Sequence, residues 1–146
     1  IKSKISNLNY KIKSIRNNIQ HNISKNLVNL DSVDTIVLEK LNIKGMTKRS
    51  EKGKSNNKKG LNRSLNDVGL YTIKTQLEYK ARLLGKSIVS VDPKYTSQTC
   101  SNCGHKNKKS RISQSKFICT NCGNIINADL NAAKNIKKKY FKSLNN

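Results

Sequence analysis

The sequence has few acidic residues, few aromatic residues and no long apolar segment. It contains 8 Asp+Glu against 30 Lys+Arg, and aromatic residues make up 5% of its 146 positions, with no Trp. Because hydrophobic residues amount to 34%, we expect a small hydrophobic core that needs an additional source of stability, such as a bound metal. No run of about 18 apolar residues is present, which excludes a membrane-spanning helix. No signal-peptide pattern is visible, so we expect a protein that is not secreted.

The formal net charge of +22 indicates a polyanionic partner, because compact folding of such a chain works against its own repulsion. Nucleic acid is the commonest polyanion, and we expect DNA or RNA to be bound in the cytoplasm, in association with the nucleoid. An anionic membrane surface is an alternative, since a basic amphipathic helix can lie on lipid; a solvated basic surface is another. Arg is scarce beside Lys, which favours phosphate contacts over bidentate reading of bases.

Four cysteines occur as two CxxC pairs, each followed by Gly: Cys100, Cys103, Cys119 and Cys122. Fifteen residues separate Cys103 from Cys119, a spacing typical of zinc sites in which two tight turns share one ion. The Gly after each pair allows the positive φ that such a turn requires. Four thiolates complete a tetrahedral shell, so the sequence predicts a structural Zn²⁺ that contributes to folding. Two disulfides and an iron–sulfur cluster are the alternatives.

An apolar stripe runs through the first thirty residues. Its members recur at steps of three and four: Ile5, Leu8, Ile12, Ile15, Ile19, Ile23 and Leu27. This period predicts a long amphipathic helix. The stripe lacks aromatic residues and a strand follows it, so we expect it to pack in a core, although a helix lying on a membrane surface has similar spacing.

The rest of the chain alternates between strand and helix patterns. The predicted elements are a strand at 35–38, a helix from 70 to 84 stopped by Gly85, a strand at 87–91 and a last helix beginning near 128. This order indicates an α/β layer with an inserted zinc ribbon.

Residues 44–63 are dense in Lys, Ser, Asn and Gly and have almost no apolar content. This composition predicts either a basic loop over nucleic acid or a solvated linker. The candidate phosphate contacts are Lys44, Lys48, Arg49, Lys52, Lys54, Lys58, Lys59 and Arg63.

The placement of the few carboxylates is informative. Glu39 closes a predicted strand, and open α/β sheets place their sites at the carboxyl ends of strands. Asp129 opens a helix just after the cysteine segment. Two such carboxylates could hold divalent ions for phosphodiester hydrolysis. Alternatively, Asp129 stabilises a helix N-terminus, and Glu39 pairs with a nearby lysine.

Four segments resemble, in one order, the TnpB (OrfB) proteins of insertion sequences, which are related to type V CRISPR effectors. VLEKLNIKGM at 37–46 is similar to the segment around the second catalytic acid of that family, and LEYKA at 77–81 to the helix that follows. VDPKYTSQTCSNCG at 91–104 resembles the entry to the family's zinc ribbon, and NADLNAAKNI at 127–136 resembles the stretch with the third catalytic acid.

The resemblance implies an RNA-guided DNA nuclease with a RuvC-like, RNase H-type fold, encoded by a transposable element. Three carboxylates bind Mg²⁺ in that family, and Glu39 and Asp129 match the second and third. The implied organisation is a RuvC-like part at 1–95, a zinc ribbon at 96–124 and a final RuvC-like helix at 125–146.

The first catalytic acid has no counterpart in this sequence. We therefore expect the C-terminal part of a TnpB-like protein, from a split, decayed or truncated gene, which is inactive, or nearly so, alone and which a separate N-terminal polypeptide could complement. A non-catalytic zinc-ribbon module that binds DNA or RNA is the alternative. A basic zinc ribbon unconnected with transposition would explain the cysteines and the charge, but not the match around Glu39 and Asp129.

Overall fold

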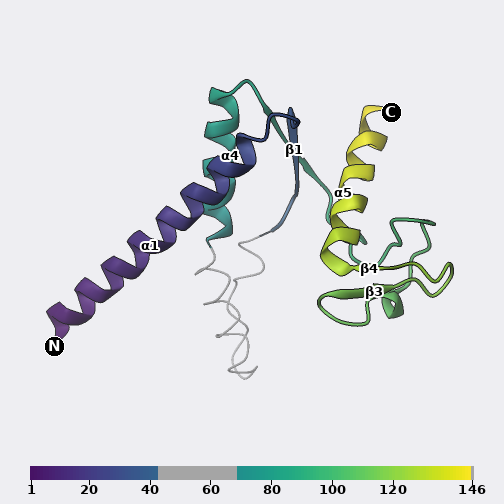
Figure 1. Cartoon of the computed structure of the whole chain (residues 1–146), viewed down its shortest axis with the longest axis horizontal. Coiled ribbons are helices and arrows are strands. Elements are labelled where there is room, and N and C mark those ends of the chain that lie inside the picture. The colour runs from purple at the N-terminus through teal and green to yellow at the C-terminus, as the bar shows by residue number, and fades with distance from the viewer. Residues whose placement is uncertain (43–68, 146) are drawn as a thin grey trace. The chain divides into compact units, whose positions relative to one another are not determined.

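The computed structural model describes residues 1–42 and 69–145 (Figure 1). The candidate phosphate contacts at positions 44–63 therefore lie outside the described residues. The chain folds as two units, residues 1–36 with 42–88 and residues 37–41 with 89–146.

Two helices form most of the described part of the first unit. Helix α1 spans Lys2–Val28 and packs against α4, which spans Leu70–Leu83 (Figure 1). Much of their interface is polar. Ser24 Oγ is 3.1 Å from Gln76 Oε1, and Gln76 Nε2 donates to Asn17 Oδ1 at 3.4 Å. Lys80 Nζ donates to Ser24 Oγ at 2.6 Å, so side-chain hydrogen bonds fix the register of the two helices.

The apolar stripe of α1 does not pack in a core, and that expectation is wrong. Its seven members are between 39% and 59% exposed. The buried residues of α1 are Gln20, Ser24 and Val28, which recur every fourth position on a different side of the helix. Because this polar side contacts α4, the stripe is left on the surface.

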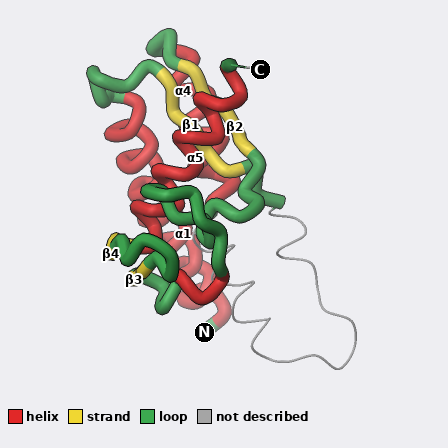
Figure 2. Tube along the Cα trace, turned by 90° about the vertical axis from the view of Figure 1, so that its right-hand side faces the viewer, coloured by secondary structure: helices red, strands yellow, loops and turns green. Residues whose placement is uncertain are grey.

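Strands β1 (Thr35–Glu39) and β2 (Ser87–Val91) form a two-stranded sheet, drawn as the paired yellow segments labelled in Figure 2. Ser87 N donates to Asp34 O, and Lys40 N donates to Val91 O, both at 2.8 Å. These bonds, at opposite ends of the pair, show that the strands run in the same direction. Helix α4 lies between them in sequence, which makes the segment a βαβ crossover.

Gly85 ends the crossover helix as expected. Its φ is 66°, and its N–H donates to Arg82 O while the Lys86 N–H donates to Ala81 O. These two bonds form a Schellman motif, which satisfies the last carbonyls of the helix and turns the chain into β2.

The second unit contains the cysteine segment and the last helix. Strands β3 (Lys116–Ile118) and β4 (Ile125–Asn127) are antiparallel, with Phe117 opposite Ile126. A short 3₁₀ helix, η1 (Lys108–Ser110), precedes them, and α5 (Ala128–Leu144) follows. Phe117 is fully buried and packs with Cys100, Cys119 and Ala128 in a small core.

The structure confirms a mixed α/β fold with strand and helix elements in the expected order. The division at residues 95 and 124 and the RuvC-like assignment stay predictions. No helix among the described residues combines the length and the apolarity needed to cross a membrane.

Candidate metal centre

The four cysteine sulfurs converge on one point of the second unit. Cys100 Sγ lies 3.8 Å from Cys122 Sγ, and Cys103 Sγ lies 3.6 Å from Cys119 Sγ. All four sulfurs are within 4.8 Å of one another, and all four cysteines are free. Zn–S bonds of about 2.3 Å at tetrahedral angles place sulfurs about 3.8 Å apart. The spacing therefore fits one metal ion and excludes the disulfide alternative.

The two CxxC turns are built alike. Gly104 and Gly123 have φ of 77° and 70°, and their N–H groups donate to Cys100 O and Cys119 O at 2.9 and 3.0 Å. The turns also contact each other reciprocally. Asn102 Nδ2 approaches Cys122 Sγ and Asn121 Nδ2 approaches Cys103 Sγ, both at 3.8 Å. Each turn thus supplies an amide donor that orients a sulfur of the other.

The sulfurs differ in acidity because they lie so close together. The pKa of Cys103 falls to about 6, first because the His105 backbone amide donates to it. At Cys122 the Asn124 backbone amide lowers the pKa, but the neighbouring Cys103 sulfur and burial outweigh it and raise the pKa to about 11. A divalent cation would let all four thiols ionise, and an all-thiolate donor set fits Zn²⁺.

Helix α5 is tied to the loop that enters the first CxxC turn. Asn131 Oδ1 accepts from Ser101 N at 2.8 Å, and Asn131 Nδ2 donates to Thr99 O at 2.8 Å. Asn135 Nδ2 donates to Thr99 O at 2.6 Å and to Thr96 O at 2.9 Å. Both asparagines are buried. These roles were not predicted from the sequence. The signal for them is the i, i+4 spacing of the two asparagines, which puts them on one helix face.

Glu39 is half-buried at the end of β1. Its Oε1 lies 2.7 Å from Thr96 Oγ1, which also lies 2.9 Å from Pro93 O. Thr96 is 3% exposed and was not singled out from the sequence. Its hydroxyl fixes one oxygen of the carboxylate, and its backbone carbonyl binds Asn135 of α5.

Asp129 lies in the first turn of α5, and its side chain is 81% exposed. Arg111 Nη2 is 3.5 Å from its Oδ1, a loose and largely solvated ion pair. Asn127 caps the helix instead, since its Oδ1 accepts from Asp129 N and Leu130 N at 2.9 and 3.1 Å. Within residues 1–42 and 69–145, the cysteines are the one cluster of three or more potential metal ligands, so Glu39 and Asp129 belong to no such cluster.

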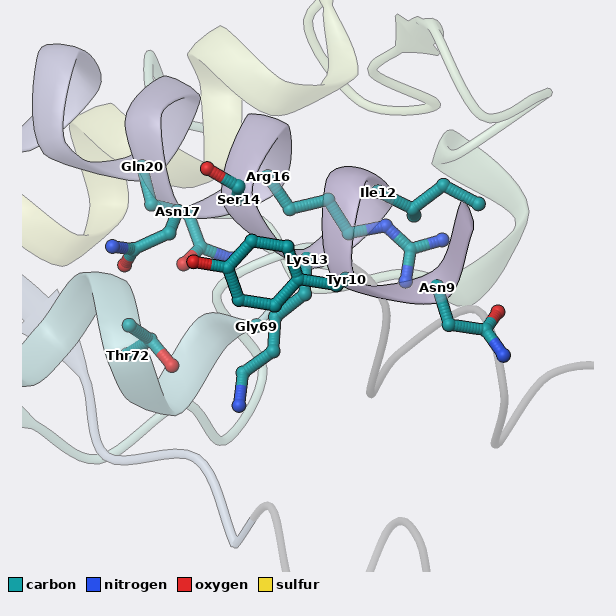
Figure 3. Close-up of a pocket in the computed structure, with 10 residues that line it drawn as sticks. All are labelled: Asn9, Tyr10, Ile12, Lys13, Ser14, Arg16, Asn17, Gln20, Gly69 and Thr72. Carbon is teal, nitrogen blue, oxygen red and sulfur yellow. The ribbon is translucent and has the colours of Figure 1, made fainter. Parts of the chain in front are cut away.

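The first unit has a separate polar hollow of about 760 Å³ between α1 and the start of α4 (Figure 3). Tyr10, Lys13 and Arg16 line it from α1, with Thr72 on α4. Its described lining contains basic but no acidic side chains, which suits an anionic partner. This hollow was not predicted from the sequence.

Comparisons with known proteins identify the family. The family model described as "Cas12f1-like, TNB domain" matches residues 71–136. The protein named "Putative RNA-guided DNA endonuclease InsQ" of Escherichia coli (strain K12) is 40% identical over 141 residues, covering 92% of this chain and 35% of InsQ. TnpB-like protein L79 of Acanthamoeba polyphaga mimivirus is 34% identical over 125 residues, covering 85% of this chain and 22% of L79. The chain belongs to the TnpB family.

The TnpB-family chain is also similar to Cas12f proteins. Cas12f1 of Sulfoacidibacillus thermotolerans is 34% identical over 136 residues, covering 90% of this chain and 29% of that protein. A cryo-EM structure of a Cas12f1–sgRNA–target DNA complex superposes with a TM-score of 0.68 at 28% identity, covering 92% of this chain and 37% of the Cas12f1 chain. The mini-RNA-guided endonuclease CRISPR-Cas_phi3 shares the fold, with a TM-score of 0.64 at 21% identity. The match covers 88% of this chain and 19% of the CRISPR-Cas_phi3 chain. The TnpB-family chain spans between 19% and 37% of the length of these relatives.

Proposed function

We propose that this TnpB-family chain supplies the metal-binding and nucleic-acid-binding part of an RNA-guided DNA endonuclease. The observation that carries the proposal is its 40% identity, over 92% of its length, to a protein named for that activity. The proposed partners are DNA, a guide RNA and a polypeptide that carries the first catalytic acid, either joined to this chain or separate. The proposed compartment is the cytoplasm, at the nucleoid.

The proposed cofactor of the four-cysteine site is a structural Zn²⁺. The sulfur separations of 3.6 and 3.8 Å support it. Because four protein ligands complete the tetrahedral shell, this ion would have no open position for substrate. Its proposed task is to hold the two CxxC turns together beside the N-terminal half of α5.

We propose Glu39 and Asp129 as Mg²⁺ ligands at the edge of a RuvC-like layer. Carboxylate oxygens are the donors that Mg²⁺ prefers, so both residues fit the ion. When bound, such ions activate the attacking water and stabilise the charge of the leaving oxygen. Thr96 holds Glu39 by Oε1, and we assign metal binding to the other oxygen. Asp129 presents an exposed carboxylate from a backbone position whose N–H is held by the Asn127 cap.

The remaining cations provide the proposed contacts to phosphate. The residues from Lys44 to Arg63 would contact DNA or guide RNA, consistent with the net charge of +22. Such contacts release counterions, so the affinity for nucleic acid should fall steeply as salt increases.

The nuclease proposal is tested by complementation. The purified chain is mixed with the upstream part of InsQ, its guide RNA, target DNA and Mg²⁺, and cleavage is followed on gels. We expect no cleavage by the chain alone, and cleavage in the mixture. Glu39→Gln and Asp129→Asn should each reduce the rate by at least 100-fold, whereas Glu78→Gln, an exposed acid paired with Lys74 on α4, should leave the rate unchanged.

Two outcomes would contradict the nuclease proposal. Equal cleavage rates for Glu39→Gln and wild type would show that Glu39 is not an active-site residue. Robust Glu39-dependent cleavage by the chain alone would show that no upstream acid is needed.

A non-catalytic binding module is the second candidate. It is favoured by the fact that the four-cysteine site is complete within the described residues, whereas the two carboxylates form no cluster of three ligands there. The same mixture separates the candidates, because a binding module would retain DNA affinity and never restore cleavage.

A further inference from the structure

Two close sulfur contacts at the four-cysteine site each join one CxxC turn to the other. Cys103 Sγ of the first turn lies 3.6 Å from Cys119 Sγ of the second, and Cys100 Sγ lies 3.8 Å from Cys122 Sγ. A disulfide bond holds its sulfurs about 2.05 Å apart, so each pair would have to close by less than about 2 Å to form one. The sulfurs that fit one metal ion are therefore also paired for two disulfides across the turns.

Exposure divides each of these pairs into an accessible and a shielded sulfur. Cys103 and Cys122 are exposed, whereas Cys100 and Cys119 are only 1% and 2% exposed. An oxidant from solvent therefore reaches one member of each pair first, and the buried partner lies beside it. An accessible sulfur next to a resolving sulfur is typical of reversible redox cysteines, because the second sulfur reacts before the first is oxidised further.

Each turn has contacts of its own that need no metal. Gly104 N and Gly123 N donate to the carbonyls of the first cysteines of their turns, and Asn131 Oδ1 accepts from Ser101 N at 2.8 Å, which ties the first turn to α5. What the ion adds is the link between the two turns. Disulfides across the turns would replace that link, whereas a disulfide inside each CxxC turn would not.

We propose that the four-cysteine site is a reversible redox switch, in which hydrogen peroxide replaces the zinc ion by two disulfides, Cys103–Cys119 and Cys100–Cys122. The inference rests on the proposed structural zinc and adds an oxidised state to the same site. In that state the two turns stay joined without the ion. A thiol-specific reductant and fresh zinc return the site to its first state.

The oxidation balances with one peroxide for each pair of sulfurs. The exposed Cys103 thiolate attacks one peroxide oxygen, the O–O bond breaks, and the sulfur becomes a sulfenic acid while hydroxide leaves. The Cys119 thiolate then attacks this sulfur, so that the S–S bond forms and the S–O bond breaks with loss of a second hydroxide. Cys122 and Cys100 react in the same way. Two peroxides thus accept four electrons from four thiolates, four protons convert the hydroxides to water, and the ion is released because it has lost its ligands.

The test uses the full chain loaded with zinc and treated with millimolar hydrogen peroxide. A chromophoric zinc indicator should report the release of one zinc per chain. After free thiols are blocked with N-ethylmaleimide, trypsin separates the two CxxC pairs into residues 95–106 and residues 117–134. We expect mass spectrometry to find these two peptides joined, with four hydrogens fewer than their sum. Reduction with a phosphine in the presence of zinc should separate the peptides and restore one bound zinc per chain.

Asn102→Lys determines which sulfurs pair. It creates a trypsin site between Cys100 and Cys103, and it should leave zinc binding stoichiometric because the exposed Asn102 side chain supplies only an amide donor to Cys122. Fragmentation of the joined peptides should show the Cys100 peptide attached at Cys122 and the Cys103 peptide attached at Cys119. The opposite pairing would contradict the contacts from which the inference starts.

Hydrogen exchange tests whether the oxidised turns stay joined. Residues 96–101 should keep their protection in the peroxide-treated chain and lose it in a reduced chain from which a chelator has removed the zinc. Equal exchange in the two zinc-free samples would show that the disulfides do not replace the link that the ion provides.

Three results would overturn the inference and leave the proposed zinc site standing. The first is zinc retained under peroxide that has converted Met46, the one methionine of the sequence, to its sulfoxide. The second is separate peptides that have each lost two hydrogens, which means disulfides inside the turns. The third is sulfinic or sulfonic acids in place of disulfides. A chain that binds no zinc before peroxide is added would contradict both proposals.

Discussion

Thr96 Oγ1 lies 2.7 Å from Glu39 Oε1, and the backbone carbonyl of Thr96 accepts a hydrogen bond from Asn135 Nδ2 at 2.9 Å. One buried threonine thus links a carboxylate at the end of β1 to the middle of α5. A fixed carboxylate oxygen leaves the other oxygen in a defined position. This is the arrangement expected of a residue that orients a metal ligand.

Removing the Thr96 hydroxyl should destabilise the second unit. Thr96→Val keeps the shape but leaves Glu39 without its donor, so we expect a loss of about 1–3 kcal/mol in the free energy of unfolding. Thr99→Val is the matched control, because the exposed Thr99 hydroxyl bonds only the nearby Tyr95 carbonyl. Urea denaturation measures both; equal losses would mean that the contact with Glu39 is energetically unimportant.

The Asn135 side chain should be essential for docking α5 to the loop before the first CxxC turn. Asn135→Ala leaves the carbonyl of Thr96 without its donor and that of Thr99 with Asn131 alone, which should cost about 1–3 kcal/mol. Lys134→Ala, at the neighbouring exposed position, should change stability by less than about 0.5 kcal/mol. Hydrogen exchange at residues 96–101 should accelerate in the first variant only. Unchanged protection there would show that the asparagine does not hold the loop.

Replacing Gly69 by Ala should destabilise the protein for two reasons, and replacing Gly85 by Ala for one. Both have positive φ, 64° and 66°, so Ala is strained at either position. A Cβ at Gly69 would also lie 2.2 Å from Gln20 Nε2, whereas nothing lies within 4 Å at Gly85. We expect Gly85→Ala to cost about 1 kcal/mol, and Gly69→Ala somewhat more, because a buried amide must move. In a Gln20→Ala background the clash is absent, so Gly69→Ala should destabilise the protein no more than Gly85→Ala does, as measured by thermal denaturation. If Gly69→Ala still destabilises it more, a clash with Gln20 is not the cause.

Metal binding should weaken as the pH falls. The Cys103 thiol, with a pKa of about 6, is ionised at neutral pH, whereas the Cys122 thiol, with a pKa of about 11, must lose its proton to the incoming metal. Protons therefore compete increasingly as pH decreases, and below pH 6 they also occupy Cys103. Competition with a chromophoric chelator should show zinc retained at pH 8 and released progressively towards pH 5. Release independent of pH would contradict thiolate ligation.

Removing one sulfur ligand should unfold the ribbon locally. Cys103→Ser should abolish stoichiometric zinc binding, and residues 96–124 should then lose protection from hydrogen exchange. Asn102→Ala is the milder comparison, because it removes only the amide donor to Cys122. It should weaken zinc binding about tenfold while one zinc per chain is retained. Full protection in Cys103→Ser would exclude a structural metal.

Local patterns in the sequence predicted the elements closely. The strand at 87–91, the last helix and the stop at Gly85 are confirmed, because hydrophobic period and glycine conformation act over a few residues. The cysteine spacing likewise predicted the convergence of the sulfurs, since each tight turn brings its own two sulfurs together by local geometry, although the two turns meet only through tertiary packing. The candidate acids Glu39 and Asp129 stay predictions.

The sequence by itself determined the positions of α1, β1, α4, β2 and α5, the two CxxC turns and the excess of positive charge. Only the tertiary structure decided which face of α1 is buried. Its apolar stripe predicted a core contact, but the hydrogen bonds of Ser24 with Gln76 and Lys80 place a polar face against α4. The tertiary structure also brought Thr96 to Glu39 and the two CxxC turns to each other, because these contacts join residues far apart in the chain. No local period encodes such pairings; they depend on how the elements pack.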